Sequence, residues 1–499
     1  MTLEAAIKRM NELQSAQHAY DHAMGVLSLD GDTAAPSGSA RGRAETMGYL
    51  SGVAYKLLIN DEVKEALDTI LDHKAEVTPE QFRQAELFKE SYDDSVRIPV
   101  EEYMAYSTLV TTANAVWHEA KEKDDYPAFA PYLEKIITYN RKFAAYKDAS
   151  KPAYDVLLDG YEKGSSTATL DPFFDLLRVR LAPVIKAVAE KPAPDTSFLH
   201  QEYPILTQRV FSDQLMRMMG IPRDRCSIAE TEHPFTNSFN KWDVRITTNY
   251  CPTDVADSMY SVIHEGGHAI YDLGTADEYQ FTNLAGGASM GIHESQSRFY
   301  ENIIGRSQAF CRALLPVMQQ LFPTQMEGVT AEQLYRAVNK AQPSLIRTMA
   351  DELTYPMHIA IRYEMEKRMI SGDVNVNELP AMWNALYKEY LGVTVPCNRD
   401  GILQDVHWAG GMIGYFPSYA LGSAYGVQML SAMEKDFDPW PDVEKGNLSR
   451  VTAWLGEKIH RHGCFLTPSQ VLRNAIGTDF DPACYVDYLT EKFTGLYKL

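Results

Sequence analysis

The sequence has few cysteines and no closely spaced cysteine pair. Its six cysteines lie at positions 226, 251, 311, 397, 464 and 484. This scatter argues against a zinc site built on C-x-x-C motifs and against a disulfide scaffold. A reducing compartment, the cytoplasm, is therefore the expected location.

Long apolar runs and an excess of positive charge are also missing. No uninterrupted apolar stretch reaches the roughly 18 residues that a membrane span requires, and the start, MTLEAAIKRMNELQ, is typical of a helix rather than of a signal peptide. Lys and Arg number 47 against 67 Asp and Glu, which gives a formal net charge of -20. This charge disfavours nucleic acid and anionic membranes as partners.

Helical periodicity is what the sequence has over most of its length. Amphipathic segments such as EQFRQAELFKESYDDS fill residues 1–190, and the proline-containing segment EKPAPDTS at 190–197 is a candidate subdomain boundary. The stretch KWDVRITTNY at 241–250 predicts a strand, because apolar residues alternate in it. We therefore expect a mainly α fold with a very small β-sheet. Residues 1–499 should form a single unit whose metal and substrate site lies within 198–499.

A metal-binding pattern follows the predicted strand, in SVIHEGGHAIYDLG at 261–274. The apolar residues have a helical period, so His264 and His268 lie on one face and can bind the same ion. Glu265 is rotated to the flank, where it can act on a metal-bound water without being a ligand. H-E-x-x-H is typical of a catalytic zinc site with a built-in general base. Asp272, one turn further, is expected to accept the second N–H of a ligating imidazole.

A catalytic zinc needs a third protein ligand. The downstream candidates are Asp277, Glu278, Glu294 and Glu301. Glu294 is favoured because GIHESQSRFYENIIG is predicted to form a helix that can pack antiparallel to the first. Its neighbour His293 points about 100° away on such a helix, so we expect it to lie near the metal without binding it.

Two glycines, Gly266 and Gly267, interrupt the metal-binding helix, at a cost of roughly 1 kcal/mol each relative to alanine. Their missing side chains would let a strand, a substrate backbone or another helix pass close to the metal. Ordinary packing of helices against small residues is the alternative. The predicted strand, ending near Tyr250, could offer an edge to which an extended peptide adds.

Five motifs occur in order along the chain: DPF at 171–173, HEGGH at 264–268, HESQ at 293–296, IRTMAD at 346–351 and GILQDVHW at 401–408. On these motifs the chain resembles the carboxypeptidase Taq family of zinc metallocarboxypeptidases. The resemblance implies a helical, deeply grooved fold like that of angiotensin-converting enzyme and thimet-type peptidases, usually as a homodimer, with residues 1–190 suggested as a lid. It also implies His264, His268 and Glu294 as ligands of zinc, which cobalt can replace, and Glu265 as general base.

The same resemblance suggests how the substrate is held. Arg347 would grip the terminal carboxylate of a peptide, for which a planar guanidinium is well suited. An ordinary ion pair with Asp351, four residues on, is the alternative. His407 followed by Tyr415 and Tyr419 is similar to the arrangement in related peptidases, where such groups donate hydrogen bonds to an oxyanion. We expect His407 and Tyr419 in that role, with Tyr415 at the substrate and as the substitute for Tyr419. Aromatic core packing is the alternative for either tyrosine.

Two remaining motifs are interpreted as structural. In DPF, Asp171 is expected to be a helix N-cap and Pro172 to occupy the first turn. HRHGC at 460–464 is expected to be a solvated helix end, because no partner with metal-ligand spacing accompanies it.

The predicted function is that of a zinc metallocarboxypeptidase of broad specificity, which releases single C-terminal amino acids from peptides with a free C-terminus. Glu265 would assist the attack of a metal-bound water. An endo-oligopeptidase with the same zinc site is one alternative, and a zinc-stabilised helical binding scaffold is another. Glu265 argues against the scaffold, because a structural zinc site needs no general base.

Overall fold

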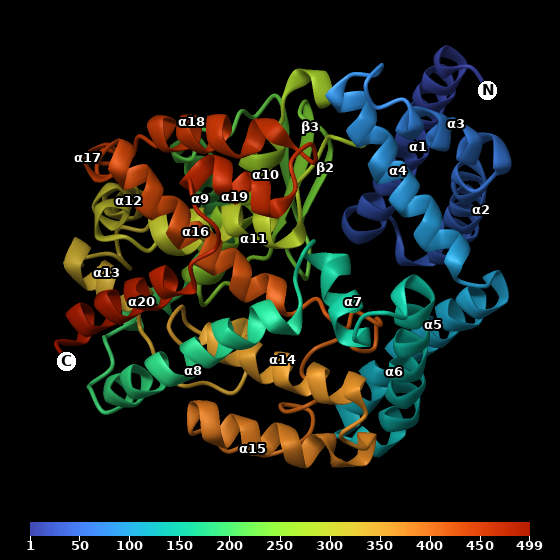
Figure 1. The fold of residues 1–499 in the computed structure, drawn as a ribbon. Helices are drawn as coiled ribbons and strands as arrows, with labels where there is room; N and C mark the ends of the chain where they lie inside the picture. The colour runs from blue at the N-terminus through green and yellow to red at the C-terminus, as the bar shows by residue number, and fades with distance from the viewer.

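Helices fill most of the computed structural model, which describes residues 1–499 (Figure 1). The first half contains α1 (Leu3–Thr33), α2 (Ala40–Leu58), α3 (Asp61–Asp72), α4 (Pro79–Arg97), α5 (Val100–Lys123), α6 (Tyr126–Asp148), α7 (Ala153–Tyr161), α8 (Thr167–Ala189) and α9 (Ile205–Met218). The second half contains α10 (Val255–Leu273), α11 (Met290–Arg298), α12 (Gln308–Leu321), α13 (Ala331–Val338), α14 (Tyr355–Ser371), α15 (Leu379–Leu391), α16 (Pro417–Asp436), α17 (Trp440–Val443), α18 (Ser449–Lys458), α19 (Pro468–Ile476) and α20 (Pro482–Tyr497). A π-helical turn, η4 (Phe299–Ile304), continues α11, and 3₁₀ turns occur at Ser37–Ser39, Ser197–Leu199, Asp277–Tyr279, Arg347–Met349, Val376–Glu378 and His460–His462.

Two hydrophobic clusters hold these helices together. The larger contains 99 buried residues, from Ala113 to Tyr497, and therefore includes residues on both sides of the segment 190–197. The smaller contains nine buried residues of α1, α3 and α4, which lie together at the N-terminal end of the molecule (Figure 1). The subdomain boundary at 190–197 stays a prediction. No helix is both long enough and apolar enough to cross a bilayer.

The small sheet has three strands, β1 (Cys226–Glu230), β2 (Thr236–Asn240) and β3 (Asp243–Thr248), in the order β1-β3-β2. β1 is parallel to β3 and β2 is antiparallel to it. The predicted strand is thus β3, and its Val244 and Ile246 are fully buried as the alternation requires. Because β3 is the central strand, the prediction that it offers a free edge to a peptide is wrong. The edges belong to β1 and β2, and β2 lies against α10.

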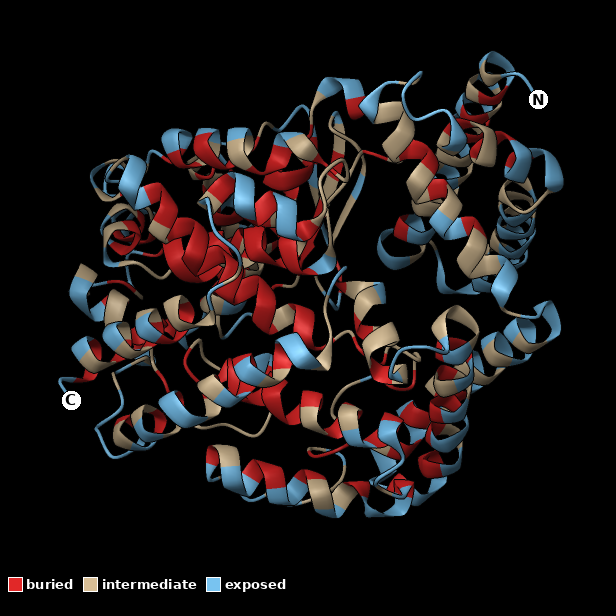
Figure 2. Cartoon of the chain, viewed as in Figure 1, coloured by how far each residue is buried: buried red, intermediate tan, exposed pale blue.

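α10, α11 and α16 are mostly buried helices and contribute to the buried interior of the molecule (Figure 2). Glycines let them approach closely. A Cβ atom at Gly267 of α10 would lie 2.7 Å from the backbone of Gln296 and Ser297, and one at Gly422 of α16 would lie 2.7 Å from the side chain of Glu294. Gly266 instead faces the side chains of Met219 and Ile221. Close approach of another helix is therefore the reason for Gly267, and α11 is held between two glycine-bearing helices.

The two motifs that were interpreted as structural differ in detail from the prediction. α8 begins at Thr167 with Ser166 as its N-cap, so Asp171 lies inside the helix and accepts hydrogen bonds from Tyr363 and Lys367, each at 2.7 Å. The prediction of an N-cap at Asp171 is wrong because the helix starts at the upstream serine. His460 is 1% exposed and its Nε2 lies 2.8 Å from Oε1 of Gln296, so the HRHGC segment is not a solvated end at this residue.

Candidate active site

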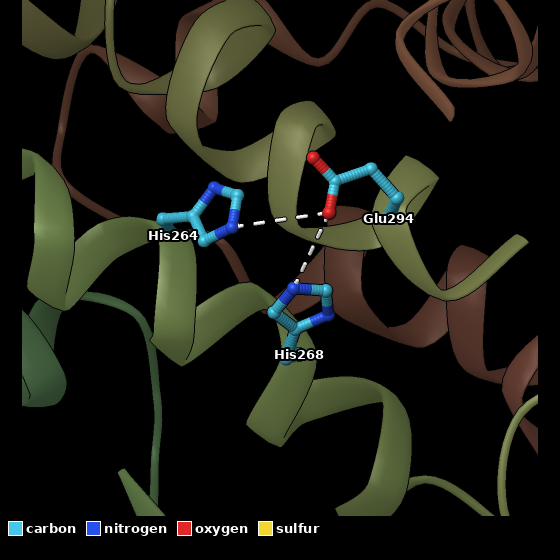
Figure 3. Close-up of side chains that lie close together, drawn as sticks. All are labelled: His264, His268 and Glu294. Carbon is cyan, nitrogen blue, oxygen red and sulfur yellow. Dashed lines mark ion pairs between the residues drawn. The ribbon is translucent and has the colours of Figure 1, made fainter. Parts of the chain in front are cut away.

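The two histidines of α10 meet a carboxylate of α11 (Figure 3). Nε2 of His264 lies 4.0 Å from Oε2 of Glu294, Nε2 of His268 lies 3.6 Å from the same oxygen, and the three ligand atoms are within 4.8 Å of one another. A tetrahedral zinc ion with bonds of about 2.0–2.2 Å holds its ligand atoms roughly 3.3 Å apart. Two imidazole nitrogens and one carboxylate oxygen are a donor set that suits such an ion, and the three atoms lie somewhat farther apart than a bound ion would hold them. The cluster contains the three residues that the sequence predicts as ligands.

Each histidine is also held through its other ring nitrogen. Nδ1 of His264 lies 2.9 Å from Oε2 of Glu301, and Nδ1 of His268 lies 2.6 Å from Nδ1 of His293. Nε2 of His293 lies 3.3 Å from Oδ1 of Asp272. Asp272 therefore reaches His268 only through His293. The prediction that Asp272 accepts an N–H directly from a ligating imidazole is wrong. These contacts fix ring orientation and leave Nε2 of each histidine free for the metal.

Arg298 joins the carboxylates of this cluster. Its Nε donates to Oε1 of Glu294 at 2.8 Å and its Nη1 donates to Oε2 of Glu301 at 2.9 Å. Although burial alone would raise it, the charge of Arg298 holds the pKa of Glu301 well below its usual range. The carboxylate that orients His264 therefore stays ionised.

Glu265 lies next to the cluster without belonging to it. The residue is 7% exposed, and its Oε2 accepts a hydrogen bond from the hydroxyl of Thr236 on β2 at 2.7 Å. Burial raises the pKa of Glu265 above its ordinary value. A cavity of about 990 Å³ opens beside His264 and Glu265 and extends to Arg347 and Tyr355. A carboxylate that can take up a proton thus faces a space large enough for part of a peptide.

Arg347 is held by a partner other than the one that simple spacing suggests. Its Nε donates to Oδ1 of Asp405 at 2.9 Å and its Nη1 donates to the hydroxyl of Tyr355 at 3.1 Å. Asp351 instead accepts hydrogen bonds from the backbone and hydroxyl of Thr354, so the alternative of an ion pair between Arg347 and Asp351 is wrong. The spacing rule for helices fails because Arg347 lies in a 3₁₀ turn that ends before Asp351.

His407 and the two tyrosines lie together beside Arg347. Nε2 of His407 is 3.1 Å from the hydroxyl of Tyr419, the ring centroids of His407 and Tyr415 are 5.7 Å apart, and the Arg347 guanidinium lies 5.1 Å from the Tyr419 ring centroid. Burial and the nearby charge of Arg347 lower the pKa of His407 to about 4. Its imidazole is therefore neutral near pH 7. None of these three aromatic residues lines the 990 Å³ cavity directly.

Residues 9–493 match the model of the family described as carboxypeptidase Taq (M32) metallopeptidase. The chain belongs to the carboxypeptidase Taq (M32) family. It is 39% identical to carboxypeptidase 1 of Bacillus subtilis over 482 residues, which cover 96% of each chain. It is 35% identical to thermostable carboxypeptidase 1 of Pyrococcus furiosus over 488 residues, 95% of this chain and 96% of that one. The structure of an M32 carboxypeptidase from Deinococcus radiodurans R1 superposes with a TM-score of 0.95 at 34% identity and covers 99% of both chains.

This membership makes the chain a metallocarboxypeptidase, a hydrolase of peptide bonds that needs a metal ion. The fold prediction, mainly α with a very small sheet beside the metal-binding helix, is confirmed.

Sequence reasoning missed two buried carboxylates that brace this M32 site. Glu366 of α14 accepts hydrogen bonds, each at 2.9 Å, from the Trp408 indole, the Gly414 backbone and the Tyr154 hydroxyl, and so fixes the segment that carries His407. Glu162 accepts the Gly291 backbone N–H at 2.9 Å in the first turn of α11. Burial raises the pKa of each to about 7. Glu162 and Glu366 look like ordinary helix residues in the sequence, so only the packing reveals them.

Proposed function

We propose that this metallocarboxypeptidase uses zinc and releases one C-terminal residue at a time, with broad specificity. The observation that supports this most strongly is the cluster of His264, His268 and Glu294 beside a carboxylate, Glu265, that is not a ligand. When bound there, zinc supplies a Lewis acid for the scissile carbonyl and lowers the pKa of a water molecule. The same donor set suits cobalt as a substitute.

Glu265 moves the proton in this mechanism. Its carboxylate accepts a proton from the attacking water and returns it to the leaving amine, as a general base and then a general acid. A raised pKa favours such a role, because a group that titrates closer to neutral pH can both take and give a proton. Its Oε1 has no hydrogen-bond partner in the protein, whereas Oε2 has Thr236.

Arg347 provides the recognition that distinguishes a carboxypeptidase from an endopeptidase. Two of its nitrogens are engaged by Asp405 and Tyr355, while Nη2 has no protein partner, and the residue lines the cavity. The free donor can bind the C-terminal carboxylate of a peptide. Although burial alone would raise it, the charges of Arg362 and Arg347 keep the pKa of Asp405 well below its usual range. Asp405 therefore stays ionised and holds the guanidinium of Arg347 in place.

His407 and Tyr419 are proposed to stabilise the oxyanion, with Tyr415 at the substrate and as the substitute for Tyr419. The imidazole is neutral and bonded to the Tyr419 hydroxyl, so the pair can present N–H or O–H groups without a charge of its own. The large cavity, whose lining mixes acidic, basic and apolar side chains, is consistent with broad specificity. A homodimer is expected from the resemblance, and a cytoplasmic location from the six unpaired cysteines.

A matched pair of peptides tests this function. The purified enzyme is incubated with an N-terminally blocked peptide, once as the free acid and once amidated, with and without chelator, and products are identified by mass spectrometry. We expect stepwise loss of C-terminal residues from the free acid alone, abolished by chelator and restored by zinc or cobalt. Internal cleavage of both peptides would instead support an endo-oligopeptidase, and cleavage of neither would favour the scaffold.

A further inference from the structure

The general base has one hydrogen-bond partner in the protein, and it comes from the sheet. The hydroxyl of Thr236 lies 2.7 Å from Oε2 of Glu265 and 3.0 Å from the backbone oxygen of the same residue. No other side chain or backbone group bonds to the Glu265 carboxylate. The metal ligands are supplied by α10 and α11, so Thr236 is the contribution of β2 to this site.

The sheet holds Thr236 independently of α10. Thr236 is the first residue of β2 and pairs with Ile246 of β3. Both backbone groups of its neighbour Phe235 bond to Thr247 of β3. The Phe235 N–H donates to the Thr247 hydroxyl at 2.9 Å, and the Phe235 carbonyl accepts from the Thr247 N–H at 2.9 Å. The hydroxyl of Thr236 is thus presented to Glu265 from a braced strand.

We propose that Thr236 is a positioning residue for the general base. This inference rests on the proposed role of Glu265. A glutamate side chain has several rotatable bonds, and a hydrogen bond that fixes Oε2 fixes the direction of the unpartnered Oε1 as well. Oε1 then takes the proton from water, while Oε2 stays on Thr236.

The hydroxyl of Thr236 has two acceptors within reach, Oε2 and the backbone oxygen of Glu265. A hydroxyl carries a single proton. It donates most strongly to Oε2 while Glu265 is ionised. When Oε1 has received its proton, the hydroxyl can turn toward the backbone oxygen at 3.0 Å, so neither protonation state leaves the threonine unpaired. Thr236 therefore orients the base without locking it in the ionised form.

The test uses Thr236→Val, which keeps the shape and removes the hydroxyl, and Thr236→Ser, which keeps the hydroxyl. Thr248→Val is the matched control, since Thr248 is a buried sheet threonine whose hydroxyl bonds to Ser261 of α10 at 3.2 Å and not to Glu265. Metal content, thermal unfolding, kcat and KM are measured for each on a blocked free-acid peptide.

We expect Thr236→Val to retain metal, folding and KM while kcat falls about 10- to 100-fold, the penalty of a misplaced catalytic group. Thr236→Ser should restore most of kcat, and Thr248→Val should leave it unchanged. Thr236→Val with an unchanged kcat, or with a loss that serine does not restore, would overturn the inference. If the valine variant does not fold, Thr236→Ala and Thr236→Ser are compared by the same criteria.

A double variant separates this inference from the proposed function. In a Glu265→Gln background, loss of the Thr236 hydroxyl should reduce kcat no further, because the two residues act as one unit. If Glu265→Gln abolishes turnover while Thr236→Val as a single variant has normal turnover, only the role of Thr236 is wrong. If Glu265→Gln itself leaves turnover unchanged, the proposed mechanism fails first.

Discussion

One methyl group at Gly267 should weaken the metal site. In Gly267→Ala the new Cβ would lie 2.7 Å from the Gln296 carbonyl oxygen and from the Ser297 Cα, both backbone atoms of α11. Cβ contacts under 3.0 Å essentially never occur and ordinary contact begins at 3.4 Å, so α10 and α11 must move apart at this point. On its far side α11 already touches α16, because a Cβ at Gly422 would lie 2.7 Å from the Glu294 side chain. The shift therefore reaches Glu294.

Two opposing effects set the change in folding free energy that Gly267→Ala causes. Alanine is favoured over glycine within a helix by about 1 kcal/mol, whereas overpacking a buried contact costs about 1–3 kcal/mol. The net loss of folding free energy is thus about 0–2 kcal/mol. Metal sites tolerate displacements of only about 0.2 Å in their bond lengths, so we expect metal affinity to fall more clearly, about 10- to 100-fold as for other groups that orient ligands.

Gly266→Ala is the matched control, because it gains the same helix propensity. Its Cβ would meet only the ends of the Met219 and Ile221 side chains, at 2.7–3.0 Å, and a flexible methionine can move away. Both variants are titrated against a competing chelator and unfolded with urea in the metal-free form. Equal metal affinity in the two alanine variants would show that the contact of Gly267 with α11 does not set the geometry of the metal site.

Three further predictions concern Arg347, Tyr419 and His460. Arg347→Ala should raise KM or depress kcat/KM for free-acid peptides, and an unchanged value would remove Arg347 from carboxylate binding. Tyr419→Phe should lower kcat about 10- to 1,000-fold if its hydroxyl serves the oxyanion, with metal content retained; a normal kcat would leave Tyr419 a packing residue. Burial lowers the pKa of His460 to about 3, so the folded state binds fewer protons than the unfolded state below pH 6.5, and stability falls with decreasing pH. Urea unfolding measures this dependence in the metal-free proteins. The free energy of unfolding of His460→Gln should fall less steeply with decreasing pH than that of the unaltered protein, by up to about 1.4 kcal/mol per pH unit. Equal slopes would contradict the burial of a neutral His460.

Local spacing predicted the parts of the site that lie on one element or on a pair of neighbouring helices. His264 and His268 are one helical turn apart, which fixes their common face whatever surrounds them. Glu294 required only that the next helix pack antiparallel to α10, and it does lie within 4.8 Å of both histidines. The fold class followed from the same helical periodicity.

Features that depend on contacts between distant segments were not predictable in this way. Asp272 lies on the expected face of α10, but His293 of α11 stands between it and His268. Arg347 finds its carboxylate 58 residues away, at Asp405, because its own segment is not an α-helix. Thr236 belongs to an edge strand that has no alternating apolar pattern, so its contact with Glu265 left no signal in the sequence.

A comparison of Glu265→Gln with Glu294→Ala separates proton transfer from metal binding. Both are purified identically, bound metal is measured by mass spectrometry, and release of the terminal residue from a free-acid peptide is timed. We expect Glu265→Gln to hold about one metal ion per chain with turnover reduced by about two or more orders of magnitude, while Glu294→Ala loses metal and turnover together. A Glu265→Gln enzyme that cleaves at the normal rate would contradict the role of Glu265 as general base, and a Glu294→Ala enzyme that retains metal and activity would contradict the role of Glu294 as a ligand.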